Sequence, residues 1–416
     1  MTALLRRGAC PGLSAPMQTG DGLLVRMLPI GTIPLQAFAG LCAAAREHGN
    51  GIVEITARGS IQVRGLDAGS APRFAAAVAA LGIAAQEGVP VLTNPLAGLD
   101  PDEVFGSSAL AADLRLALAG TDLAARLSPK VSVVVDGGGS PGIEEISADV
   151  RLRAEQTNDH VALRISVGTS AKPLGDVAPT HAVGAILRAL DVIARRGRDA
   201  RARDIVAAEG DALFRAALEN SAPAAVDFRL RGSERKSPIG AHRLHEPSFA
   251  YGVGLAFGHA DATLLEELTQ AAKAAGAHGM RAAPDRVLMV IGLTQETIDT
   301  FAADAERLGF ITHAGDARRR VIACAGAPIC ASAYIAARAL APHLAAALPD
   351  RTSTIHISGC AKGCASSAPA TLTVVGRADG CALIANGSTR DVPFAVAATD
   401  QLPAAIAGAL REGSHV

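Results

Sequence analysis

The chain has 416 residues, more than one hydrophobic core usually holds, and this length predicts two or more domains. Apolar residues make up 49% and charged residues 19%, a balance that excludes a disordered protein. With 39 basic and 40 acidic side chains the net charge is −1, so no overall field attracts nucleic acid or a membrane surface. An anionic ligand must therefore meet a local basic cluster.

The first part of the chain predicts a β-α-β unit. Its expected elements are a strand over 22–28, a helix over 34–47, strands over 52–55 and 60–64, and a helix over 72–81.

The same pattern returns later in the chain. Here the expected elements are a strand over 252–258, a helix over 263–275, and strands over 279–282 and 286–290. Aligning Gly51 with Gly279 also places Arg58 over Arg286. This indicates an internal duplication of two half-modules that pair to complete one sheet or one domain.

Between the repeats lies a distinct middle region. It predicts a β-rich run over 127–137, a hairpin pair over 150–153 and 160–167, a helix over 181–195 and a charged loop over 196–203. Residues 230–245 are rich in Arg, Lys, Ser, Gly and Pro and are typical of a linker into the second half.

The chain carries no sign of a membrane or export segment. No run of 18 apolar residues occurs, and the pair Arg6-Arg7 is followed by 8–12 (GACPG), not by the apolar region of a signal peptide. Seven cysteines, an odd number with four grouped late, favour metal chemistry over disulfides. We expect a cytoplasmic protein.

The most specific feature is the pattern Cys-x5-Cys followed by Cys-x3-Cys, made by Cys324, Cys330, Cys360 and Cys364. Iron–sulfur clusters take four thiolates, and the Gly and Ala residues around each pair let the backbone approach a cluster closely. The pattern therefore predicts a [4Fe–4S] cluster. Zinc is the chemical alternative, although the five-residue gap fits its usual ligand spacing less well. The third interpretation is buried, inert cysteines.

These residues carry a resemblance to a known superfamily. The order of half-repeat, middle domain, half-repeat and cysteine region resembles the sulfite and nitrite reductases, and 56–65 (TARGSIQVRG) look like their Thr-x-Arg-x-x-(Phe/Ile)-Gln-x-x-Gly motif. The resemblance implies an α+β fold of two ferredoxin-like half-repeats plus two α/β domains, with the [4Fe–4S] site in the C-terminal part. We expect a half-repeat over 1–84, the middle domain over 85–230, a half-repeat over 237–312 and the cluster and tetrapyrrole-binding domain over 315–412.

Within this superfamily the likeness is to the precorrin-3B synthase family of cobalamin biosynthesis. Residues 10–13 (CPGL), 16–17, 20–24, 95–103 and 356–365 look like motifs of that family. The resemblance implies an O2-dependent monooxygenase that hydroxylates precorrin-3A at C20 and forms a lactone from a ring acetate. It further implies NADH as the ultimate reductant, a [4Fe–4S] centre and a separate mononuclear non-haem iron, whose ligands the sequence does not assign.

The chain departs from the reductases at their cationic ring. Sulfite reductases present four cationic side chains to a small anion on sirohaem, and Arg58 and Lys130 match two of them. The family's second lysine falls at Ser132, and its remaining arginine, expected near Val89, is absent. Losing half the ring weakens anion reduction, because the developing charge needs preorganised donors.

Precorrin-3A carries many carboxylates, which arginine forks bind in bidentate fashion. The candidate substrate-contact residues are Arg58, Arg64, Lys130, Arg286 and Lys362. The alternative for each strand residue is a solvated surface charge, and Lys362 could instead tune the cluster.

We expect the tetrapyrrole to take the place that sirohaem holds in the reductases, with the cluster supplying electrons to an O2-activating iron. His242, His245 and His356 are candidate ligands of that iron, although a lone histidine is more often structural.

Two other functions compete with the monooxygenase: a sirohaem-dependent sulfite or nitrite reductase, and a non-catalytic Fe–S electron-transfer protein. The glycine run at 137–139 lacks the spacing of a dinucleotide fingerprint. NADH is therefore expected to act through a separate reductase.

Overall fold

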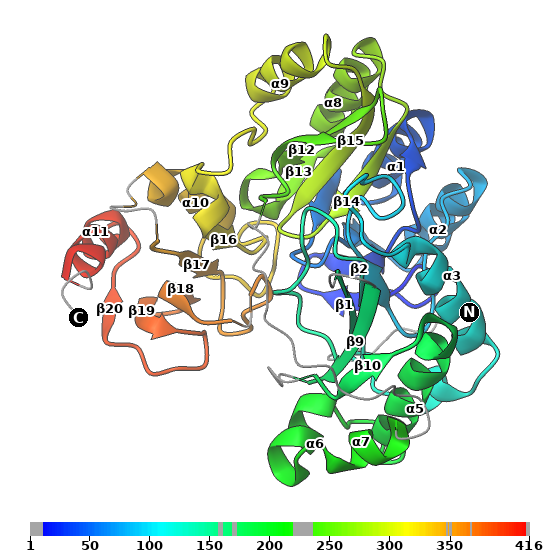
Figure 1. Ribbon diagram of the computed structural model, residues 1–416. Helices are drawn as coiled ribbons and strands as arrows, with labels where there is room; N and C mark the ends of the chain where they lie inside the picture. Colours follow the sequence, from blue (N-terminus) through cyan, green and yellow to red (C-terminus); the bar gives the residue numbers. More distant parts are fainter. Residues whose placement is uncertain are drawn as a thin grey trace.

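The computed structural model describes residues 11–156, 161–168, 173–218, 236–346, 348, 352–366 and 368–412. Within these ranges the strands form four sheets of five strands each, with helices packed against them (Figure 1). No helix of the described part is long and apolar enough to cross a membrane.

Two antiparallel sheets have matching strand orders. The first runs β1-β2-β5-β4-β13 and the second runs β11-β12-β15-β14-β3. Each takes its last strand from the other half of the chain, because β13 pairs with β4 and β3 pairs with β14. The predicted duplication is confirmed, and the halves form two sheets that exchange an edge strand. The strands of these sheets are β1 (Met17–Thr19), β2 (Gly22–Met27), β3 (Ile33–Pro34), β4 (Ile52–Ile55), β5 (Ile61–Leu66), β11 (Gly240–Arg243), β12 (Phe249–Gly254), β13 (His259–Asp261), β14 (Gly279–Ala283) and β15 (Val287–Leu293).

One hydrophobic core is shared by both halves. Phe38 and Leu41 of the first central helix lie in the same buried cluster as Leu265 and Leu268 of the second. The helices predicted over 34–47 and 263–275 are confirmed to within one residue at each end. The helices of the two halves are α1 (Leu35–His48), α2 (Ser70–Ala80), α8 (Ala262–Ala274) and α9 (Ile298–Arg307).

The strand predicted over 252–258 is wrong at its end. β12 stops at Gly254, and the chain turns through η2 (Ala256–Gly258), where Phe257 has a φ of 60°. Phe257 packs against the core of the C-terminal domain, so a tertiary contact overrides the local strand preference. The predicted linker over 230–245 also contains strand β11, and its residues up to 235 lie outside the described ranges.

The other two sheets also share one topology. The strand orders are β6-β7-β8-β9-β10 and β16-β17-β18-β19-β20, and in each the first three strands are parallel and the last two antiparallel. The sequence did not predict this second repeat. The strands are β6 (Val91–Thr93), β7 (Val133–Asp136), β8 (Val150–Gln156), β9 (Val161–Val167), β10 (Gly175–Val177), β16 (Val321–Ala323), β17 (Ile355–Ser358), β18 (Ala370–Arg377), β19 (Gly380–Gly387) and β20 (Ala395–Ala397).

Helices cover these two sheets. The predicted hairpin pair is confirmed as β8 and β9, and the helix predicted over 181–195 is confirmed as α5. In the β-rich run over 127–137 only β7 is a strand. The helical segments are α3 (Ser107–Ala119), α4 (Leu123–Arg126), α5 (Ala182–Ala194), α6 (Ala202–Glu209), α7 (Ala212–Leu218), α10 (Ala337–Ala346), α11 (Leu402–Glu412), η1 (Pro179–His181) and η3 (Ala317–Arg320).

Candidate functional site

The four candidate cluster cysteines lie on two loops at one edge of the C-terminal sheet. Cys324 follows β16 directly, and Cys330 lies further along the same loop. Cys360 and Cys364 follow β17, which runs parallel to β16. Because the carboxyl ends of parallel neighbours meet at the same edge, the fold brings the two pairs together. The Gly359 N–H donates to the Cys324 sulfur at 3.1 Å, which joins the two loops.

The four thiols share one electrostatic neighbourhood. Burial raises the pKa of the Cys324 thiol, and the charges of Cys360 and Cys330 raise it further. Burial also raises the pKa of Cys364, together with the charges of the other three thiols, while the Arg64 guanidinium opposes this rise. Thiolates that repel one another in this way need a bound positive group to remain ionised together.

The four thiols are not grouped as the ligands of one metal ion. Among the described residues, no three His, Cys, Asp or Glu side chains lie close enough to hold a single metal ion. Zinc would need its four sulfurs about 3.8 Å apart, given tetrahedral bonds of about 2.3 Å. A cluster places iron and sulfide between the thiolates and so holds them further apart. The lack of a single-ion group among the described residues is thus compatible with a cluster, whose ligand sulfurs lie further apart.

The turn between β1 and β2 packs directly against this site. A Cβ built on Gly20 would lie 2.4 Å from the Cys330 sulfur, so only glycine fits there. The Ala331 N–H donates to the Gly20 carbonyl at 2.9 Å. The first half-repeat thus contributes one wall of the cysteine site.

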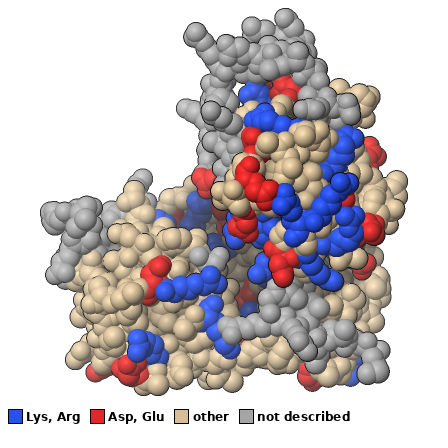
Figure 2. All heavy atoms as spheres, turned by 90° about the horizontal axis from the view of Figure 1, so that it is seen from below, with Lys and Arg blue, Asp and Glu red and all other residues tan. Residues whose placement is uncertain are grey.

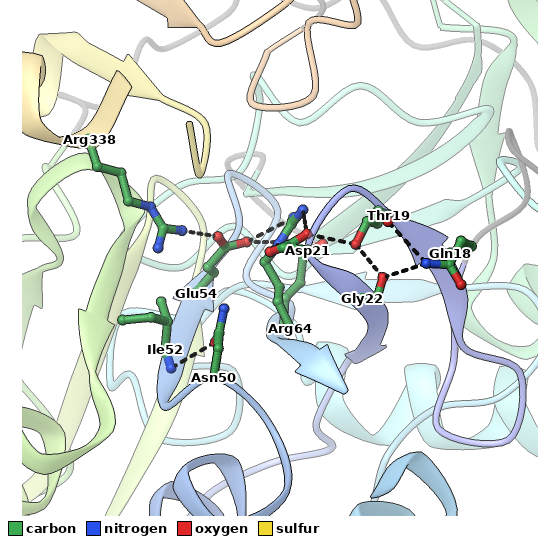
Figure 3. A network of polar contacts seen from close by, with 10 residues as sticks. Gln18, Thr19, Asp21, Gly22, Asn50, Ile52, Glu54, Arg64 and Arg338 are labelled. Carbon is green, nitrogen blue, oxygen red and sulfur yellow. Dashed lines mark hydrogen bonds and ion pairs between the residues drawn. The ribbon is translucent and has the colours of Figure 1, made fainter. Parts of the chain in front are cut away.

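Arg64 lies in a buried ion network next to this wall (Figure 3). Its Nε and Nη2 donate to the two carboxylate oxygens of Asp21 at 2.8 Å each, and its Nη1 lies 3.8 Å from Glu54. Burial opposes the charge of Arg64, but the hydrogen bond to Asp21 and the charge of Glu54 outweigh it and raise the Arg64 pKa. Arg338 of α10 bonds the other oxygen of Glu54. Of these four residues, only Arg64 was predicted as a site residue from the sequence. The single charge of Glu54 in the otherwise apolar strand 52–55 could have indicated that the strand carries a buried ion pair.

Arg58 connects the first half-repeat to the middle domain. Its Nη2 donates to the Ser132 hydroxyl at 2.7 Å and to the Ser147 carbonyl at 3.1 Å. The hydroxyl that stands where the reductases have a second lysine therefore holds Arg58. Lys130 is exposed on the same loop and has no ion-pair partner among the described residues.

The turns that carry Arg58 and Arg286 meet, as the duplication requires. Arg58 forms an isolated β-bridge with Pro284, and the Asp285 N–H donates to the Ala57 carbonyl at 3.2 Å. Arg286 lies just before β15, with a φ of 63°. Burial lowers its pKa, and the described residues offer its guanidinium no hydrogen-bond partner.

Arg286 lines a cavity of about 410 Å³ together with two further arginines that the sequence analysis missed, Arg319 and Arg320. Figure 2 shows Lys and Arg side chains along the rim of a hollow on one face of the molecule. Lys362 lies between the cluster cysteines and donates to the Ser332 hydroxyl at 2.6 Å. The three arginines of this cavity suit an anionic ligand.

The three candidate iron-binding histidines are in different settings. His242 is buried on β11 with Nε2 3.3 Å from the Pro238 carbonyl, and His245 is exposed. His356 on β17 is fully buried, and neither ring nitrogen has a hydrogen-bond partner in the described part of the chain. Because no three suitable ligands gather around them in the described part of the chain, these histidines do not fit a mononuclear iron site.

Comparisons with known proteins place this fold in a class. Residues 15–81 match the model of the nitrite/sulfite reductase ferredoxin-like half domain. The solved structure of the NirA protein of Mycobacterium tuberculosis superposes with a TM-score of 0.73 at 21% identity, over 94% of this chain and 81% of that one. The chain thus has the nitrite and sulfite reductase fold.

A curated relative defines the family more closely. The chain is 39% identical to a precorrin-3B synthase of Sinorhizobium sp over 413 residues, which cover 97% of this chain and 88% of the relative. It is 24% identical to the ferredoxin–nitrite reductase of Synechococcus elongatus over 395 residues, 87% of this chain and 77% of that one. The chain belongs to the precorrin-3B synthase family. The family motif that begins at Cys10 has that cysteine outside the described residues.

Proposed function

We propose that this protein is a precorrin-3B synthase, an oxidoreductase that uses O2 to hydroxylate precorrin-3A at C20 with lactone formation in cobalamin biosynthesis. The observation that carries the proposal is the 39% identity to a curated precorrin-3B synthase over nearly the whole chain. In this reaction one atom of O2 enters the product and the other leaves as water, with two electrons drawn ultimately from NADH.

The four cysteines would hold a [4Fe–4S] cluster, which supplies electrons one at a time when bound. The Gly359 N–H, which donates to Cys324, would also stabilise the thiolate form that ligation needs. The residues near the cysteines then divide by what they contact. Arg64 is paired with Asp21, so its role is to organise the wall of the site.

The remaining cations suit the carboxylates of a tetrapyrrole. Arg286 has no hydrogen-bond partner for its guanidinium among the described residues, and Lys130 is exposed without an ion pair there. Among the described residues Lys362 bonds a hydroxyl and has no ion-pair partner, so its charge is available to an anion. Arg58 donates to Ser132 and Ser147 and would lie at the edge of the surface that carries these cations.

Electrons from NADH would arrive through a separate reductase in the cytoplasm. The glycine run after β7 is packed against protein: a Cβ on Gly137 would lie 2.4 Å from Glu103 and 2.5 Å from the Phe105 carbonyl. The Cβ side of Gly137 is thus already covered by protein, which supports a separate reductase.

The test is anaerobic purification with iron, sulfide and absorption analysis, followed by precorrin-3A, isotope-labelled O2 and a reductant. About four irons without sirohaem bands, and a product that carries one labelled oxygen atom, support the proposal. Sirohaem bands with sulfite or nitrite turnover would return the protein to the reductases. Purified protein that contains zinc and no iron would contradict the proposed cluster.

A further inference from the structure

A buried network of four charged side chains lies against the loop that carries Cys324 and Cys330, and the sequence pattern did not reveal it. Arg338, Glu54, Arg64 and Asp21 follow one another in a continuous chain of ion pairs (Figure 3). Their side chains are only 12%, 15%, 11% and 2% exposed. Two cations and two anions balance, so the network is neutral as a whole.

One end of the network reaches the loop of Cys330. Asp21 lies in the β1–β2 turn, next to Gly20, whose position touches the Cys330 sulfur. The Thr19 hydroxyl donates to Asp21 at 2.7 Å and holds this carboxylate in the turn. Arg64 also lies within electrostatic reach of Cys364 on the second loop.

The other end reaches the loop of Cys324. A Cβ on Gly326 would lie 2.4 Å from the backbone nitrogen of Ala337, so this loop packs on the first turn of α10. Cys324 packs against the same core as Ala337, and Arg338 is the next residue.

Arg338 is only partly satisfied by the protein. Its Nη2 bonds Glu54, but its Nε and Nη1 are buried and have no hydrogen-bond partner among the described residues. Buried donors without acceptors are costly, so native proteins rarely leave them unused. Sulfur atoms of a cluster are acceptors of the required kind.

We propose that Arg338 is a positioning residue that stabilises the reduced cluster, and that Glu54 sets the strength of this effect. Reduction adds one electron, and hence one negative charge, to the cluster. A buried cation stabilises that charge, and a buried anion opposes it, because screening is weak away from water. This inference rests on the cluster of the proposed function.

The neighbouring histidine does not disturb this balance. His259 of β13 lies opposite Glu54 in the sheet register, and its Nδ1 is buried without a partner in the described chain. Burial and the charge of Arg338 lower the His259 pKa to about 4, so its ring is neutral at pH 7. A change at Arg338 or Glu54 therefore alters the local charge by one unit.

The experiment compares R338Q, E54Q and the double variant with the wild type. The cluster midpoint potential is measured in each by anaerobic titration with dithionite, followed by electron paramagnetic resonance. R338Q should shift the potential to more negative values, E54Q to more positive values, and the double variant should return close to the wild type. A merely structural role would not produce shifts of opposite sign.

Controls separate tuning from folding. R307Q removes the exposed Arg307–Asp304 pair on α9 and should leave the potential unchanged. If R338Q does not retain iron, two variants still test the proposal. R338K keeps the positive charge and should have a midpoint potential close to that of the wild type. E54Q should still shift the potential to more positive values.

Equal potentials, or shifts in one direction for both single variants, would overturn the proposal, as would a wild type without a [4Fe–4S] cluster. Failure of the proposed function is a separate result, because it appears as absence of the oxygenated product whatever the potentials are.

Discussion

The middle and C-terminal sheets share one topology but carry different side chains at the same edge. In the middle domain, Asn94 follows the first parallel strand and accepts the N–H of Gly137, which follows the second, at 2.8 Å. In the C-terminal domain, Cys324 and Gly359 occupy the corresponding positions and make the corresponding contact at 3.1 Å. One scaffold contact is thus made by an amide oxygen in one domain and by a thiol in the other.

The side chains of the loops in the two domains also differ in other ways. The middle loops are closed by their own carboxylates, since Asp100 accepts the Ser140 N–H and Glu103 accepts the Gly98 N–H at 2.7 Å. The C-terminal loops instead present four thiols. The comparison teaches that in both domains the side chain after the first parallel strand joins the two loops, whereas the C-terminal loops carry the four thiols that we propose as cluster ligands.

The largest expected effect comes from making the C-terminal edge resemble the middle one. In C324N the amide can still accept the Gly359 N–H, but it cannot act as a thiolate ligand. Bound iron should fall from about four atoms to near zero, and product formation should be lost. Iron and sulfide analysis measures this directly.

The matched control is C381A, which removes a buried cysteine whose sulfur lies 3.9 Å from the Thr399 hydroxyl on another part of the sheet. It should retain the wild-type iron content. A C324N protein that still bound four irons would mean that Cys324 is not a ligand.

The two sheets also differ at His356 of β17, because Val134 occupies the equivalent position on β7. Burial, and to a lesser degree the charge of Arg286, lower the His356 pKa from 6.5 to about 4. The unfolded chain therefore binds a proton more readily, and stability is lost as the pH falls from 6.5 towards 4. The loss reaches roughly 3 kcal/mol at about 1.4 kcal/mol per pH unit.

H356V should remove this part of the acid sensitivity, measured as the slope of the unfolding free energy between pH 6.5 and 4.5. The part due to His259 should remain. H343A on the exposed face of α10 is the control and should keep the wild-type slope. An unchanged slope in H356V would show that His356 is solvated or paired in solution.

Substitution of Asn94 tests whether the stability of the middle domain depends on the buried amide at this edge of its sheet. N94A leaves the buried Gly137 N–H without its acceptor and removes the bonds of the amide nitrogen to Gly139 and Pro141. Denaturant unfolding should show a loss of about 2 kcal/mol, with unchanged iron content.

The exposed Asn50 makes one local bond to Ile52, so N50A should change stability by less than about 0.5 kcal/mol. Equal effects of N94A and N50A would contradict the comparison, because the middle edge would then not need its buried amide.

The smallest effect concerns the residues that precede the second parallel strand of each domain. S132A removes a buried acceptor of Arg58, which keeps its bond to Ser147, so the unfolding free energy should fall by about 1 kcal/mol. T354A, at the half-buried counterpart that bonds Thr371, should cost less. The reverse order, measured by denaturant unfolding, would mean that Ser132 does not hold Arg58.

Sequence periodicity identified the elements of the ferredoxin-like halves well, because their buried faces repeat at regular intervals. The helix ends at His48 and Ala274 differ from the expected ends by one residue. The end of β12 was missed, since Phe257 leaves the strand to pack on the C-terminal core. The second repeat was missed too, because it is one of topology and not of side-chain pattern.

The sequence by itself determined the cysteine pattern, the family motifs and the internal duplication, since each depends on residues at fixed spacing. Only the tertiary structure decided which charges meet. Asp21, Glu54, Arg64 and Arg338 come from segments far apart in the chain, and they pair because the β1–β2 turn, β4, β5 and α10 converge on the cysteine loops. Burial at that junction removes water, which makes each charge depend on its neighbours.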